Sequence, residues 1–321
     1  LLETLAEGND EVQRVAAWAL GRMGGQERVA PLLHLYWNRR GDVREAIAWA
    51  LAQSLSDPAK TPALPDEELA VELGHVDYDA ARRQLAKTTD PGRLRVSSAH
   101  ADDLAAGIVE ALGRHRDIVL QVLSELDSAP DRLAAGAFRV DSAVLKTIAR
   151  RIEPALAALC AHQDADVRER ALRLLAKSRS SEAPARITAA LAQPSSRDRT
   201  SALDAAALYV ELAGARATGT TELARAVATQ TNAPQWQERV AALRALARMG
   251  QIADATQIAN SLGDRSGFVR EAAALVLGQL AGTGNQSVLP GLLRASQDDV
   301  PEVRLAAVAG LRRVGGKAAV D

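Results

Sequence analysis

One arginine recurs at the same place in a repeated motif, and its side chain could bind an acidic group. It follows a valine near the start of a predicted helix at four positions: Arg44, Arg168, Arg270 and Arg304. A guanidinium group donates two parallel hydrogen bonds to a carboxylate or a phosphate. Four such groups could therefore line a groove for phosphate or for an acidic peptide, if the helices that carry them place them side by side.

Residue types that support catalysis are present, but not in a catalytic arrangement. The five histidines are never four residues apart and never adjoin a glutamate, which argues against the metal-binding pairs of helical metalloenzymes. Cys160 lies in an apolar predicted helix and is interpreted as a small core residue. Adjacent acids such as Asp298 and Asp299 suit turns better than general acid-base catalysis. We predict no enzymatic activity, no bound metal and no cofactor.

Composition limits the remaining function classes. Lys+Arg number 39 and Asp+Glu number 40, for a net charge of −1, so overall charge gives no reason to expect nucleic acid or an acidic membrane as a partner. No apolar run approaches the roughly 18 residues of a membrane span, and no signal peptide is recognisable. The many arginines and alanines suggest a bacterial origin, and we predict a cytoplasmic location.

The helices that carry these residues form an internal repeat. In the second helix of each predicted unit, a small or branched residue stands four positions before a leucine. These anchors are Ala16, Ile47, Ala171, Ala242, Ala273 and Ala307, with weaker ones at Ile108 and Ala202. Ile47 follows Ala16 by 31 residues, and Ala171 follows Ile47 by 124, which is four times 31. Units this small cannot bury an apolar face alone, so they must stack on one another.

Helix start and stop signals support helix–turn–helix units. Asp42 and Asp166 are each followed three residues later by a glutamate, the spacing of an N-cap and an N3 residue. Glycines follow several second helices, as in LGRMGG at 20–25. First helices are expected to begin near a proline, as in VAPLL at 29–33 and IEPAL at 152–156. No strand pattern is evident.

The string ALGRMGGQERVAPLL at 19–33, followed by DVREAIAWAL at 42–51, resembles the HEAT-repeat family, and specifically its short phycobilisome-lyase HEAT-like type. The resemblance extends over about 1–55 and 150–321. It implies an all-α fold, a right-handed α-solenoid of stacked helix–turn–helix repeats. It also implies that the motif arginines join neighbouring repeats, together with Asp42 and Asp166.

We expect three regions along the chain. Residues 1–55 and 141–321 are HEAT-like repeats, whereas 56–140 departs from the pattern and begins with a Pro-rich linker. That central stretch contains a plausible helix from Asp102 to Arg114 and is either a set of degenerate repeats or an irregular insertion that contacts a partner. Leu1 and Leu2 align with a helix interior in the next repeat, so we expect an upstream part of a larger protein.

Four aromatic residues are candidate contacts for a partner. Trp18 and Trp49 stand at equivalent positions 31 residues apart, two residues after their anchors, and Tyr36 and Trp37 lie between them. Such side chains dominate many protein interfaces. The alternatives are that the tryptophans stack between repeats or pack against repeats upstream.

The leading hypothesis is a non-catalytic scaffold that binds a protein partner on the inner surface of the solenoid and on its irregular stretch. An alternative is a nucleic-acid-binding protein similar to the HEAT-type DNA glycosylases, for which GRLR at 92–95 supplies Arg93 and Arg95 as local positive charge. A further alternative, implied by the resemblance, is a phycobilin lyase-like protein.

Overall fold

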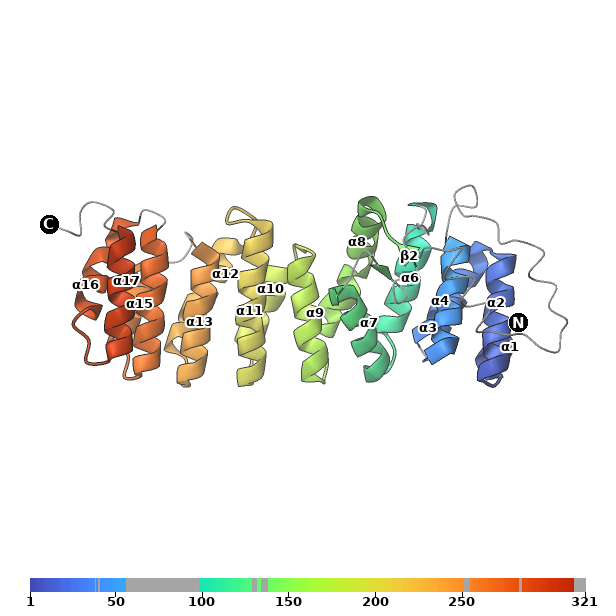
Figure 1. Cartoon of the computed structure of the whole chain (residues 1–321), viewed down its shortest axis with the longest axis horizontal. Coiled ribbons are helices and arrows are strands. Elements are labelled where there is room, and N and C mark those ends of the chain that lie inside the picture. Colours follow the sequence, from blue (N-terminus) through green and yellow to red (C-terminus); the bar gives the residue numbers. More distant parts are fainter. Residues whose placement is uncertain are drawn as a thin grey trace. The chain divides into compact units, whose positions relative to one another are not determined.

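The computed structural model describes residues 1–37, 39, 41–55, 98–128, 132–133, 138–250, 255–282 and 285–314. The chain divides into two compact units, Leu1–Leu156 and Ala157–Asp321, which are described separately. The described residues are almost entirely helical, as Figure 1 shows. The all-α class of stacked helical repeats predicted from the sequence is confirmed.

Unit 1 contains two helix pairs followed by less regular packing. The pairs are α1 (Leu2–Glu7) with α2 (Asp10–Met23), and α3 (Val29–Trp37), after a short 3-10 turn, with α4 (Gly41–Leu55). The helices α6 (Ala101–Leu112), α7 (Arg116–Ser128) and α8 (Ser142–Leu159) follow, and the boundary between the units falls near the end of α8. The helix predicted from Asp102 to Arg114 thus corresponds to α6, within the stretch expected to be either degenerate repeats or an irregular insertion.

Close approach of small residues fixes the packing in unit 1. A Cβ added to Gly21 of α2 would lie 2.9 Å from the Cα of Ala50 and 2.5 Å from the Trp49 ring, both on α4. A Cβ on Gly107 of α6 would meet Leu33 of α3 at 2.3 Å. The weak anchor Ile108 is therefore wrongly placed in a second helix, because α6 packs against the first helix α3. The apolar pattern alone does not distinguish the two helix types.

Unit 2 alternates short first helices with longer second helices. The second helices are α9 (Ala165–Lys177), α11 (Ser196–Ala213), α13 (Trp236–Met249), α15 (Gly267–Gly282) and α17 (Pro301–Val314). The first helices are α10 (Ala183–Leu191), α12 (Thr220–Thr229), α14 (Ala255–Asn260) and α16 (Leu289–Ala295). Each second helix packs against the next, and this row lies in front of the first helices in Figure 1.

The core contains the anchor residues. Ala171, Ala202, Ala242, Ala273 and Ala307 are all 0 % exposed. The leucines four positions later are buried at Leu175, Leu246 and Leu277, whereas Leu311 of α17 is half-buried. This burial confirms the register in unit 2, because a shift by one residue would rotate each anchor out of the core.

The predicted helix starts require correction. The N-cap of α9 is Asp164, whose carboxylate accepts hydrogen bonds from the backbone N–H groups of Asp166 and Val167. Asp166 is thus inside the helix, and Asp42 likewise lies inside α4, which begins at Gly41. Both positions still place an acid in the first turn, where the helix dipole favours it. An acid with a glutamate three residues later therefore does not by itself locate an N-cap.

Other predicted boundaries have mixed outcomes. Gly24 and Gly250 end α2 and α13 with positive φ angles of 59° and 65°, as expected of C-cap glycines. Pro154, however, lies inside α8 and does not begin a first helix, so the IEPAL prediction is wrong. Arg132–Leu133 and Phe138–Arg139 also form a two-residue antiparallel pair (β1 and β2) that the sequence did not indicate.

Candidate functional site: an arginine ladder and an exposed helix face

Four arginines in unit 2 each hold a carboxylate of the following repeat with two hydrogen bonds. Arg168 of α9 donates from Nε to Oδ1 of Asp198 at 3.0 Å and from Nη2 to Oδ2 at 2.9 Å. The same geometry recurs in three further pairs: Arg199 with Glu238, Arg239 with Asp264, and Arg270 with Asp298. We call these four pairs the arginine ladder. It links all five repeats that carry the second helices of unit 2.

The remaining guanidinium nitrogen holds the loop in front of the same helix. Nη1 of Arg239 donates to the backbone carbonyls of Ala233 and Pro234, at 2.9 and 3.0 Å. Nη1 of Arg168, Arg199 and Arg304 likewise donates to the two carbonyls that lie six and five residues earlier in the chain. Nη1 of Arg270 donates to one such carbonyl, six residues earlier. Each ladder arginine therefore joins its helix, the preceding loop and the next repeat.

The ladder is only slightly exposed, so its charges interact strongly. Side-chain exposure is 7 % for Arg239 and 13 % for Asp264. Hydrogen bonds from Arg168 lower the pKa of Asp198, although burial alone would raise it. Hydrogen bonds from Arg270 likewise lower the pKa of Asp298 to about 2. These acids are charged at neutral pH, and the arginines use their hydrogen-bonding capacity within the chain.

The sequence motif located half of the ladder arginines and missed the others. Arg168 and Arg270 were predicted, whereas Arg199 and Arg239 were not, although all four stand three residues before an anchor. In the missed repeats the valine of the motif is replaced by an acid, Asp198 or Glu238, which is itself the partner of the preceding arginine. Spacing from the anchor was the signal that could have found them.

The other predicted ladder residues have different partners. Arg304 bonds the carbonyls of Asp298 and Asp299 and is exposed. Asp42 accepts a hydrogen bond of 3.2 Å from Arg14 of α2, the preceding second helix. Asp166 accepts a hydrogen bond from Arg197 of α11, the following second helix. Both acids thus contact a neighbouring repeat, through arginines that lie outside the repeated motif.

In unit 1, Arg44 belongs to a partly buried polar cluster. Its Nη2 donates to the Tyr36 hydroxyl at 2.8 Å and to Glu125 of α7, and its guanidinium carbon lies 4.5 Å from the centroid of the Tyr36 ring. The Tyr36 hydroxyl donates to Oε1 of Glu125 at 2.7 Å. Burial, and secondarily the charge of Glu125, raises the pKa of Tyr36. The cluster joins α3, α4 and α7.

Two of the four aromatic candidates for partner contact are buried, and Trp18 and Trp49 stack between repeats, which is the alternative given with that prediction. Tyr36 is 0 % and Trp49 is 7 % exposed. Trp18, which is half-buried, stacks on Trp49 with ring centroids 6.4 Å apart and ring planes 12° apart. The flank of α4 that carries Trp49 is covered by a neighbouring repeat. Trp37 ends α3, but its side chain is outside the described part of the structure.

The basic candidates of the central stretch gain no support from the structure. Arg93 and Arg95 lie outside the described residues. Nearby, Arg114 pairs with Glu110 and Arg116 pairs with Asp117, so their charges are balanced locally. Among the described residues, no group of three His, Cys, Asp or Glu side chains could hold a metal ion. Burial raises the pKa of Cys160 to about 12, so its thiol is protonated at neutral pH.

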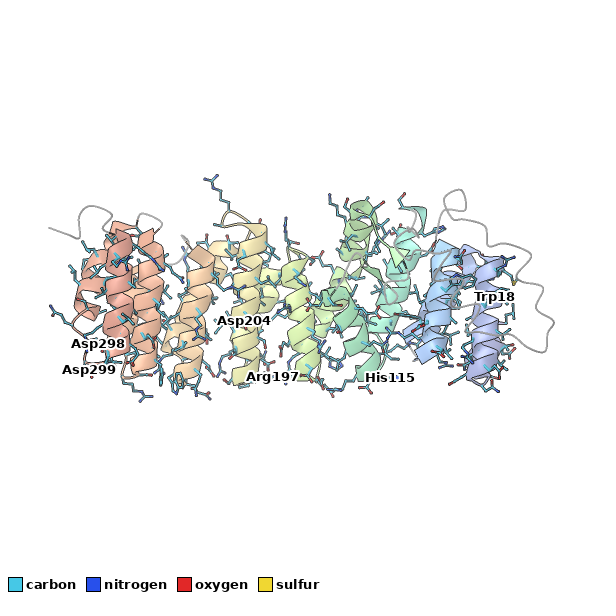
Figure 2. All side chains as sticks on the ribbon, viewed as in Figure 1. Trp18, His115, Arg197, Asp204, Asp298 and Asp299 are labelled. Carbon is cyan, nitrogen blue, oxygen red and sulfur yellow. The ribbon has the colours of Figure 1, made fainter. Side chains whose placement is uncertain are left out.

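The second helices of unit 2 leave one face exposed. Its centre is formed by the residues two positions after the anchors, all exposed: Arg173, Asp204, Arg244, Leu275 and Ala309. Asp204 lies midway along α11 in Figure 2, whereas Arg197, Asp298 and Asp299 lie at the lower edge, where the second helices begin. We call this surface, with its flanking exposed side chains, the second-helix face.

Large apolar side chains gather on the α13–α17 part of this face. Leu275 is 46 % exposed, Phe268 63 % and Leu305 73 %. Phe268 stacks on Trp236 of α13, with ring centroids 4.9 Å apart and the rings inclined by 22°. None of the described helices is both long and apolar enough to span a bilayer. Sequence inspection missed this group, because its members occupy different positions in each repeat.

Two segments of the chain match family models. Residues 1–66 match a model described as HEAT repeats, and residues 288–316 match a model described as HEAT repeat. Neither is the phycobilisome-lyase type, which is not confirmed. No curated protein sequence matches the chain.

Solved structures that match the chain include engineered and natural proteins. One engineered protein is 17 % identical with a TM-score of 0.45, over 66 % of this chain and 98 % of its own. A second engineered protein is 19 % identical with a TM-score of 0.37, and the match covers 98 % of this chain and 87 % of that protein. A structure of Kap95p with RanGDP matches at 12 % identity and a TM-score of 0.43, over 98 % of this chain and 44 % of that one.

Proposed function

We propose that this chain is a non-catalytic scaffold that binds a protein partner on the second-helix face of unit 2. The observation that supports this best is the exposure of Phe268 and Leu275 on α15 and of Leu305 on the adjoining helix α17. Contiguous apolar groups on a protein surface commonly mark an interaction site, because leaving them in water is unfavourable. Rigid stacked helices provide an extended surface of this kind.

The arginine ladder supports the same proposal through rigidity. Because each ladder arginine fixes both a loop and the next repeat, the second helices hold a constant register under the exposed face. A preformed surface loses less conformational entropy on binding than a mobile one. The ladder itself is assigned a structural role, which replaces the alternative of a groove in which these arginines bind phosphate.

Site-directed photo-crosslinking tests the location. A photoreactive phenylalanine analogue is placed at Leu275, on the second-helix face, or at the exposed Arg225 of the first helix α12 as a matched control. In cell extract we expect a discrete crosslinked protein from position 275 and none from 225. Equal products from both positions, or none from either, would contradict the proposed face.

A further inference from the structure

The second-helix face carries more positive than negative charge toward the C-terminal ends of its helices. The exposed cations there include Arg244 and Arg248 of α13 and Arg312 and Arg313 of α17. Arg248 is neutralised by Glu211 of α11, with contacts of 3.1 Å from Nε and 2.7 Å from Nη2. It follows that this region has cations in excess of those already paired.

The remaining cations lack ionic partners within the described part of the chain. Arg244, Arg312 and Arg313 form no ion pair there, and Asp204 of α11, which is 77 % exposed, lies 3.9 Å from the already paired Arg248. Such exposed guanidinium groups remain available to a carboxylate from another molecule. An acidic ligand is therefore the electrostatic complement of this region.

Apolar groups lie among these cations rather than apart from them. Leu275 of α15 occupies the same position in its helix as Arg244 does in α13, two residues after the anchor. Leu305 stands on the next helix and is 73 % exposed. Uncharged contacts and acids such as the half-buried Glu271 and the exposed Glu302 do not suit a phosphate backbone, which favours uninterrupted positive charge.

We propose that the α13–α17 part of the second-helix face binds an acidic peptide segment that also carries large apolar side chains. The inference rests on the proposed function and specifies the partner. Packed helices lie about 8–10 Å apart, and an extended chain advances about 3.3 Å per residue, so residues about six apart in the segment reach α13 and α17, and the residues between them pass over α15. Carboxylates then meet Arg244 and Arg312, and an apolar side chain packs on Leu275.

A labelled synthetic peptide of repeating Glu-Ser-Leu, 15 residues long, is the probe, with fluorescence anisotropy as the measurement. We expect binding to the intact chain and none by the matched Lys-Ser-Leu peptide. Arg244→Glu should weaken binding about tenfold, which corresponds to loss of one favourable charge contact and gain of a repulsive one. Arg225→Glu, on the first-helix side, should leave the affinity unchanged. Asp204→Arg should strengthen binding.

The apolar component has its own test. Leu275→Ser should weaken binding of the Glu-Ser-Leu peptide but leave any binding of a Glu-Ser-Ser peptide unchanged. Failure of the acidic peptide to bind, equal binding of the lysine peptide, or tighter binding of duplex DNA that ignores Leu275→Ser would each overturn the proposal. Crosslinks from position 275 to a partner that persist with Arg244→Glu would overturn the acidic chemistry and leave the scaffold function standing.

Discussion

Arg239 binds both carboxylate oxygens of Asp264, with Nε 2.7 Å from Oδ2 and Nη2 2.9 Å from Oδ1. Arg239 lies on α13, and Asp264 lies just before α15 in the next repeat. Since both side chains are largely buried, the pair connects two repeats where water competes little for the hydrogen bonds. The other three members of the ladder place the same contact at each successive junction.

Removal of one member of this pair should destabilise unit 2 substantially. Arg239→Ala removes two hydrogen bonds from the Asp264 carboxylate and one from each of two backbone carbonyls, and breaking a buried pair in this way costs about 3–5 kcal/mol. Arg197→Ala is the matched control, because Arg197 is 54 % exposed, and ion pairs in contact with solvent contribute far less to stability. Urea unfolding followed by circular dichroism measures both. Equal losses in the two variants would contradict the assigned role of the ladder.

Truncation of an interior anchor leucine should also be costly. Leu277 is 0 % exposed, and Leu277→Ala should lower the free energy of unfolding by about 2–5 kcal/mol through lost apolar burial and a residual cavity. The nearby Leu275→Ala removes an equal volume from a side chain that is 46 % exposed and should cost less than about 1 kcal/mol. A comparable loss from both substitutions in chemical denaturation would show that the register of α15 is wrong.

A pair of glycines should tolerate no side chain where α15 and α17 meet. A Cβ on Gly278 would lie 2.8 Å from the Cα of Gly310, which is backbone and cannot rotate away. Gly278→Ala should therefore lower the melting temperature, with a cost of about 1–3 kcal/mol from overpacking that exceeds the gain in helix propensity. A Cβ on Gly282 would lie 3.9 Å from Arg313, which is an ordinary contact, so Gly282→Ala should be neutral or stabilising. A rise in melting temperature for Gly278→Ala would refute the close packing.

The acids of the ladder should make stability depend on pH at its acidic end. The pKa of Asp298 falls from an ordinary 3.8 to about 2 in the folded chain. A carboxyl with a lowered pKa contributes stability above its unfolded pKa and loses it as the pH falls through the folded pKa. We therefore expect the free energy of unfolding to decrease between about pH 4 and pH 2.

Comparison of two amide variants isolates this contribution. Asp298→Asn should flatten the pH dependence in that window, whereas Asp204→Asn should not, because Asp204 is 77 % exposed and its ion pair with Arg248 is long, at 3.9 Å, and screened by solvent. Urea unfolding at a series of pH values provides the measurement. An unchanged slope for Asp298→Asn would mean that Arg270 does not stabilise the charged carboxylate.

Much of the fold could be predicted from residue periodicity. The anchors Ala171, Ala242 and Ala273 are fully buried because an amphipathic stripe reports which side of a helix meets its own core. Boundaries were less accurate: the N-cap of α9 is Asp164 rather than Asp166, because acids in the first turn and acids at the cap look alike in sequence. The position of Pro154 inside α8 was missed for a similar reason, because the sequence does not distinguish a proline in the first turn of a helix from one in its interior.

The sequence by itself determined the repeat, its register and the presence of arginines at a constant distance before the anchors. Only the tertiary structure decided which acid each arginine meets, that Arg44 belongs to a cluster with Tyr36, and that Trp49 is covered while Phe268 is exposed. The physical reason is that a helix encodes the face directed at its own core, whereas burial of its flanks depends on the repeat that packs beside it.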